Sequence, residues 1–165
     1  MRSHISAVTL LAVALSVAAP GATAEELTRI LFGSCLEASR GVPTLQSAVA
    51  LAPDLFVFLG DNVYADTTSE TAMRAAYAEL AARPEFRALQ RTCPIVATWD
   101  DHDYGRNDAG RNFPARDTAE EVFLDFWEVP PDAERRQRPG VYAARMIESV
   151  GGRIQLILLD TRFFR

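Results

Sequence analysis

The stretch that decides the fold is residues 54–62, Asp-Leu-Phe-Val-Phe-Leu-Gly-Asp-Asn. Every residue after Asp54 is apolar until Gly60, Asp61 and Asn62, which are natural turn formers, end the run. A continuous apolar run of this length is typical of a strand that is covered on both faces, as in a parallel sheet. We therefore predict a buried parallel strand over 54–59 and a turn that starts at Gly60.

Two further apolar runs lie on either side of this strand in the sequence. Residues 29–33 are followed by Ser34 and Cys35, and residues 94–99 (Pro-Ile-Val-Ala-Thr-Trp) are followed by a cluster of acidic residues at 100–103. Residues 43–52 carry apolar side chains at helical spacing, and Pro84 divides two helix-forming segments, 69–83 and 85–91. Strand, helix and strand in this order make a parallel βαβ unit, so the sequence predicts an α/β fold.

The remaining third of the chain predicts a loop, a helix and a pair of strands. Residues 106–116 are polar and rich in Gly and Asn, and residues 117–128 carry an apolar stripe behind a capping-box spacing of Thr118 and Glu121. Residues 141–149 and 153–160 predict two paired strands around two glycines. No repeat and no internal linker divides the chain, so we predict one domain.

Composition excludes several classes of protein. The chain has 165 residues with a formal net charge of −5, which leaves no excess of cations to neutralise a nucleic-acid backbone. Two cysteines and two histidines are too few for a zinc ribbon or a disulfide-dense scaffold. An apolar share of 48% is that of an ordinary globular domain.

The N-terminus has the pattern of a secretory signal peptide over residues 1–24. A short positive start precedes an apolar stretch from residue 5 to 19, and Ala-Thr-Ala precedes the acidic pair at 25–26. The apolar stretch is shorter than the ~20 residues of a comfortable membrane span. An uncleaved N-terminal anchor is the alternative. We expect export to the periplasm or the extracellular space, with a mature domain over 25–165 in which His102 is the sole histidine.

The three predicted strands all end in groups that can bind a metal ion. The first ends at Cys35, the second at Asp61, and the third at Asp100 and Asp101. If the strands are parallel, these ends meet at the edge where open α/β sheets bind ligands. We therefore predict that the thiol and the carboxylates converge on a common site.

Each part of this constellation has a structural alternative. Asp61 and its neighbours, taken alone, favour an ordinary turn; the alternative is a carboxylate that bridges two cations with Tyr64 beside it. The acidic cluster at 100–103 reads as a solvated loop or as a cation site. His102 reads as a structural histidine or as a protonated imidazole that donates to a leaving group.

The two cysteines are expected to lie apart. Cys35 follows the carboxyl end of one strand, whereas Cys93 precedes the amino end of another, and these edges are about 15–20 Å apart for strands of five or six residues. A disulfide requires Cα atoms within about 7 Å. We therefore expect Cys35 to be a thiolate near the metal and Cys93 to be a buried small apolar group.

Four stretches of the sequence together resemble the alkaline phosphatase D (PhoD-like) metallophosphatases: residues 32–35, 60–64, 98–103 and 159–162. The resemblance implies a four-layer α-β-β-α sandwich, of which this chain is the N-terminal half with its parallel βαβ units. It implies hydrolysis of a small phosphate monoester or diester at a dinuclear centre of Fe(III) and Ca(II), by attack of a metal-bound hydroxide on phosphorus. Stable membrane attachment after signal cleavage is not expected, and the oligomeric state stays open.

The resemblance also implies roles for individual residues. Cys35, Asp61 and Tyr64 are implied iron ligands, with Asp61 bridging the two metals. Asp101 is an implied ligand of the second metal, and His102 assists the leaving group or the phosphate. Asp100 is a further ligand or a support for its neighbours. Arg106 and Arg111 read as phosphate contacts or as solvated loop arginines.

Members of this family draw further ligands, including histidines, from a second half that follows residues 159–162. We therefore expect this sequence to be the N-terminal part of a longer enzyme. The alternative from another class is a truncated remnant without turnover, which binds Ca²⁺ weakly through Asp61 and Asp101.

Overall fold

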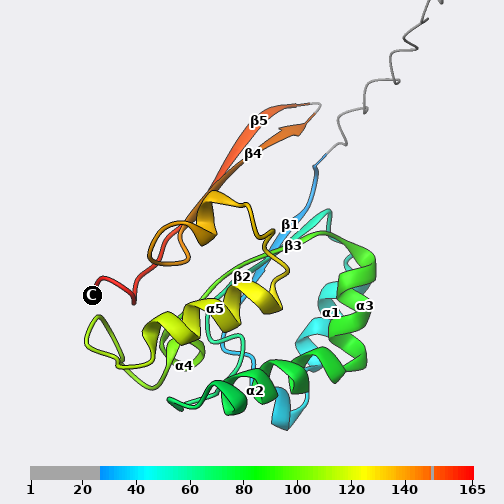
Figure 1. The fold of residues 1–165 in the computed structure, drawn as a ribbon. Coiled ribbons are helices and arrows are strands. Elements are labelled where there is room, and N and C mark those ends of the chain that lie inside the picture. Colours follow the sequence, from blue (N-terminus) through cyan, green and yellow to red (C-terminus); the bar gives the residue numbers. More distant parts are fainter. Residues whose placement is uncertain (1–26, 150) are drawn as a thin grey trace, which may run out of the picture.

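The computed structural model describes residues 27–149 and 151–165. The predicted signal peptide, residues 1–24, lies outside the described residues. A parallel sheet stands between a group of helices and a separate β-hairpin (Figure 1). The mixed α/β architecture that the sequence predicts is confirmed.

The sheet has three parallel strands in the order β1-β2-β3: Ile30–Gly33, Leu55–Leu59 and Ile95–Thr98. Val57 of β2 pairs with Phe32 of β1 and with Val96 of β3, so the strand at the centre is the one with the longest apolar run. Its side chains alternate between two cores. Phe56 and Phe58 belong to the large helical core, and Leu55 and Val57 belong to a smaller core on the other face. Burial on both faces explains why β2 lacks polar alternation.

Four helices cover the face of the sheet that carries Phe56 and Phe58: α1 (Pro43–Ala50), α2 (Glu70–Ala82), α3 (Pro84–Thr92) and α5 (Arg116–Phe126). Pro84 opens α3, where its missing N–H costs nothing, and Ser69 caps α2 by accepting from the N–H of Ala72. The capping box expected from Thr118 and Glu121 is wrong. Helix α5 already begins at Arg116 behind Ala115, which makes no side-chain cap, so Thr118 lies inside the helix.

A single helical turn, α4 (Asp101–Tyr104), follows β3 and was not predicted by the sequence. It carries the capping box of this region. The Asp100 side chain accepts from the N–H of Asp103, and the Asp103 side chain accepts from the N–H of Asp100. The acidic cluster is therefore part of a capped helix start rather than a loose loop.

The hairpin consists of β4 (Ala143–Ser149) and β5 (Gly152–Leu158), paired antiparallel as predicted. Leu158 packs with Leu55, Val57 and Val96 in the small core, so the hairpin lies toward the face of the sheet that the helices leave free. The Oγ1 of Thr98 donates to the carbonyl of Leu159 over 2.8 Å and links β3 to the end of the hairpin. No helix among the described residues is long and apolar enough to cross a membrane.

Candidate metal centre

The first two strands end in residues with left-handed backbone conformations. Cys35 has φ 57° and Asp61 has φ 49°, a region that side chains other than Gly rarely adopt. The N–H of Cys35 donates to the backbone carbonyl of Gly60 over 3.2 Å, and the N–H of Leu36 donates to the backbone carbonyl of Asp61 over 2.8 Å. These bonds tie the two turns together beyond the ends of β1 and β2. Such conformations persist where the surroundings hold them, and they are concentrated at functional sites.

The carboxylate of Asp61 faces a different set of groups with each of its oxygens. Its Oδ2 lies 3.6 Å from the Cys35 Sγ and 3.4 Å from the Tyr64 hydroxyl. Its Oδ1 lies 3.4 Å from the backbone N of His102. Asp61 is buried, so few waters compete for these oxygens. The carboxylate thus stands between a thiol–phenol pair and the start of α4.

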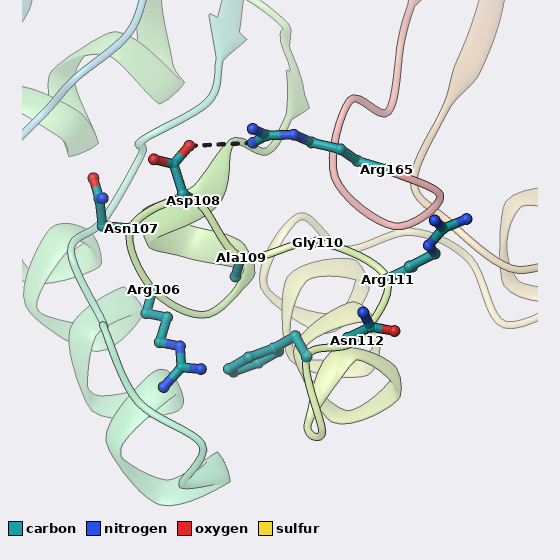
Figure 2. Close-up of a pocket in the computed structure, with 9 residues that line it drawn as sticks. Arg106, Asn107, Asp108, Ala109, Gly110, Arg111, Asn112 and Arg165 are labelled. Carbon is teal, nitrogen blue, oxygen red and sulfur yellow. Dashed lines mark hydrogen bonds and ion pairs between the residues drawn. The ribbon is translucent and has the colours of Figure 1, made fainter.

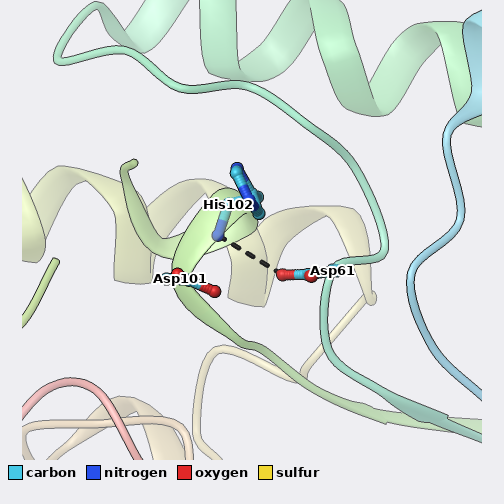
Figure 3. Close-up of side chains that lie close together, drawn as sticks. All are labelled: Asp61, Asp101 and His102. Carbon is cyan, nitrogen blue, oxygen red and sulfur yellow. Dashed lines mark hydrogen bonds between the residues drawn. The ribbon is translucent and has the colours of Figure 1, made fainter. Parts of the chain in front are cut away.

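Donor atoms of Asp61, Asp101 and His102 lie within 4.8 Å of one another (Figure 3). In Figure 3, Asp101 and His102 project from α4, and Asp61 reaches toward them from the segment after β2. The two carboxylates can hold a divalent cation with the imidazole beside them, whereas a thiolate and a phenolate suit a transition-metal ion such as iron. Asp61 thus lies between the Cys35–Tyr64 pair and the carboxylate of Asp101, and the cluster of Asp61, Asp101 and His102 could hold a metal ion.

Asp103, which the sequence analysis did not single out, organises this region. Its buried carboxylate accepts hydrogen bonds from the backbone N–H groups of Asp61 and Asn62 at 2.9 Å and of Asp100 at 2.7 Å. Burial raises the pKa of Asp103 to about 7, against the opposing effect of the N–H donors of Asp100 and Asn62. The position of Asp103, the third residue of the single turn α4, gives no signal in the sequence that it binds the end of another strand.

Asp66 is the second residue that the sequence did not indicate. Its Oδ1 lies 2.7 Å from the Nδ1 of His102, and since a carboxylate only accepts, Nδ1 is the donor. Burial lowers the pKa of His102, but the hydrogen bond to Asp66 and the charges of Asp66, Asp61 and Asp101 outweigh it, so that the pKa is raised. The bond leaves Nε2 as the ring nitrogen for other partners.

Tyr64 lies against His102, with 4.4 Å between the ring centroids. Burial, followed by the charges of Asp61 and Cys35, raises the pKa of Tyr64 to about 12. Without a cation the phenol therefore keeps its proton at neutral pH. A bound metal of high charge is what favours its phenolate.

The adjacent residues Asp100 and Asp101 differ in their surroundings. Asp101 belongs to the cluster with Asp61 and His102, whereas Asp100 pairs through Oδ1 with the Nε of Arg162. Burial raises the pKa of Asp101, but the N–H of Asp108, its own N–H, and the charges of Arg162 and His102 lower it below its ordinary value. Arg162 belongs to the last of the four stretches that carry the family resemblance, but its sequence position alone gives it no role.

Arg106 and Arg111 lie on the loop after α4 and line a pocket of about 470 Å³. Figure 2 shows Arg106 on one side of this pocket, Arg111 on the other, and Arg165 turned toward Asp108. Among residues 27–149 and 151–165, neither Arg106 nor Arg111 forms an ion pair. The N–H of Asp108 donates to Asp101 Oδ2 over 2.6 Å, so the pocket adjoins the carboxylate cluster.

The two cysteines are free thiols in the structure. Cys35 is exposed beside Asp61, and Cys93, ahead of β3, is buried as expected of a small apolar group.

One solved structure, described as "Structure of PhoD", is similar to this chain with a TM-score of 0.65. The two are 20% identical, and the match covers 89% of this chain and 33% of the other. The chain thus spans about a third of the length of the structure it matches, and the likeness supports a partial metallophosphatase-like fold. A scan against protein-family models found no match, and a search of curated proteins found none either.

Proposed function

We propose that this chain belongs to a metal-dependent phosphoric ester hydrolase of the PhoD-like type, a phosphomonoesterase or phosphodiesterase. The observation that carries the proposal is the placement of Asp61. One oxygen faces Cys35 and Tyr64, and the carboxylate also belongs to the cluster with Asp101 and His102. A carboxylate in this place can bridge the two ions of a dinuclear centre.

In this proposal Cys35, Tyr64 and Asp61 would hold Fe(III), and Asp61 and Asp101 would contribute to the site of Ca(II). When bound, the two ions supply Lewis-acid chemistry, by which they screen the phosphate oxygens and lower the pKa of a water molecule. Local cations also allow an acidic chain, with a net charge of −5, to attract an anionic ester.

His102 is the proposed proton donor to the leaving oxygen. Its Nδ1 is hydrogen-bonded to Asp66, and this bond raises the pKa of His102, which favours the protonated ring. Nε2 is therefore the atom from which we infer that the proton leaves. Arg106 and Arg111, which carry charge at the adjoining pocket, are proposed to contact the substrate's phosphate.

Hydrolysis of p-nitrophenyl phosphate and of bis-p-nitrophenyl phosphate, each with Fe(III) and Ca(II) added, tests the proposal. We expect turnover that D61N abolishes, whereas D132N, at an exposed aspartate on the connection after α5, leaves it unchanged. Turnover that survives D61N contradicts the bridging role. Ca²⁺ binding without turnover of either ester supports the alternative of a non-catalytic Ca²⁺-binding protein.

We further propose export, with residues 1–24 removed as a signal peptide. N-terminal sequencing of the protein recovered from the periplasm or the medium is expected to begin at Glu25. Recovery from the cytoplasm with Met1 intact contradicts this proposal.

A further inference from the structure

Arg162 stands on a tightly held turn after β5. The Oδ1 of Asp160 accepts from the N–H groups of Arg162 and Phe163, each over 2.9 Å. The Oδ2 of Asp160 accepts from the N–H of Val141, also over 2.9 Å, and ties the turn to the segment before β4. The backbone that carries Arg162 is therefore fixed from two sides.

The guanidinium of Arg162 lies among three carboxylates and is only 13% exposed. Its Nε contacts the Asp100 Oδ1, its Nη2 lies 3.4 Å from the Asp101 Oδ1, and its Nη1 lies 3.7 Å from the Asp108 Oδ1. The planar fork thus engages the two adjacent aspartates with different nitrogens. A single ammonium group cannot reproduce this arrangement.

Asp101 is restrained on both of its oxygens. Arg162 approaches Oδ1, and the N–H of Asp108 donates to Oδ2 over 2.6 Å. Asp100, by contrast, has its Oδ1 bound to Arg162 and lies outside the cluster of Asp61, Asp101 and His102. Two neighbouring carboxylates would otherwise compete for the same cation.

We propose that Arg162 is a positioning residue that separates the roles of the two aspartates. It keeps Asp100 as its own ion-pair partner and holds Asp101 toward Asp61 and His102. The inference rests on the proposed metal centre, and it adds to that centre the reason why one aspartate of the pair is a ligand and the other is not.

Charge alone predicts the opposite effect of replacing Arg162. A cation 3.4 Å from Asp101 repels a metal ion there, so the loss of its charge would tighten metal binding. A positioning role predicts weaker binding, including in R162K, which keeps the charge but loses the fork. In R162K, charge alone therefore predicts an unchanged affinity, whereas a positioning role predicts a weaker one.

The test measures the affinity of the full chain for Mn²⁺ by electron paramagnetic resonance, which needs no turnover. We expect R162K to weaken Mn²⁺ binding by about tenfold or more, as removal of a group that orients a ligand does. R136K is the matched control, because Arg136 is also mostly buried and pairs with Asp125 over 3.0 Å away from the cluster. We expect R136K to bind Mn²⁺ as the wild type does.

If R162K does not fold, a second pair of variants tests whether Asp100 and Asp101 have different roles in metal binding. D101N is expected to abolish the site, and D100N, which keeps an oxygen for the helix cap, is expected to leave the affinity within about twofold. Equal loss in D100N and D101N overturns the inference, as does an R162K affinity equal to or tighter than that of the wild type. Wild-type protein that binds no Mn²⁺ overturns the proposed metal centre and the inference together, whereas the other two results overturn the inference alone.

Discussion

The buried carboxylate of Asp103 accepts a hydrogen bond from the backbone N–H of Asp61, 42 residues away in the sequence, over 2.9 Å. Asp103 lies on α4 after β3, and Asp61 follows β2. The bond fixes the turn that presents Asp61 relative to the helix that presents Asp101 and His102. The geometry of the proposed centre therefore depends on a side chain that is not itself proposed to bind metal.

Replacing Asp103 is expected to remove these hydrogen bonds and to lower the stability of the chain. At pH 8, above its raised pKa of about 7, the ionised carboxylate accepts three backbone hydrogen bonds. We expect D103A to lower the free energy of unfolding by about 3 kcal/mol, because buried N–H donors lose their partner. Urea denaturation at pH 8 measures the change. The exposed Asp132 provides the control, and a D103A loss no larger than that of D132A contradicts the role.

Gly60 permits the close approach of β2 and β3 at the site. It has φ 109°, and a Cβ there would lie 2.5 Å from the Cβ of Asp100 and 2.6 Å from its N. We expect G60A to destabilise the chain by about 2 kcal/mol or more and to weaken Mn²⁺ binding, because the added methyl group forces the turn that presents Asp61 away from the backbone of Asp100. In G151A the added methyl group meets nothing within 4 Å, so thermal unfolding of the two variants should differ clearly.

The ion pair of Asp66 and His102 makes stability depend on pH. The pKa of His102 is raised above its ordinary value of 6.5, so the pair adds stability below pH 6.5 that is lost as the pH rises through the raised value. We expect D66N to lower the pKa of His102, measured by NMR titration of the imidazole. Since Asp66 is exposed, the stability difference from the wild type should stay below about 1 kcal/mol. An unchanged pKa in D66N would show that the contact does not form in solution.

Tyr64 gives the Fe(III) site a spectroscopic signature. The pKa of Tyr64, raised to about 12, keeps the phenol protonated in the metal-free protein, so a visible tyrosinate band should appear only when Fe(III) is added. We expect Y64F to lose this band. Tyr142, exposed and stacked on Arg138, serves as the control, and Y142F should keep the band. A band that persists in Y64F would mean that another group binds the iron.

Much of the fold could be predicted from local patterns. The run at 54–59 predicts the central strand because burial on both faces leaves no polar alternation, and the three strand ends identify Cys35, Asp61 and Asp101 as neighbours. Local patterns also led to a wrong prediction, the capping box at residues 118–121. Thr118 and Glu121 have the spacing of a capping box, but both lie inside α5, which begins at Arg116. A capping box is instead formed by Asp100 and Asp103 at the start of α4.

The sequence by itself determined the strands, their parallel order and the edge at which the candidate ligands gather, because these follow from hydrophobicity and chain connectivity. Only the tertiary structure decided which groups these carboxylates contact. Asp66 is hydrogen-bonded to His102, Asp103 accepts from the N–H of Asp61, and Asp100 is paired with Arg162. The physical reason is that a carboxylate responds to the charges and donors around it in space. Those partners come from segments dozens of residues away, whose side-chain directions no local pattern encodes.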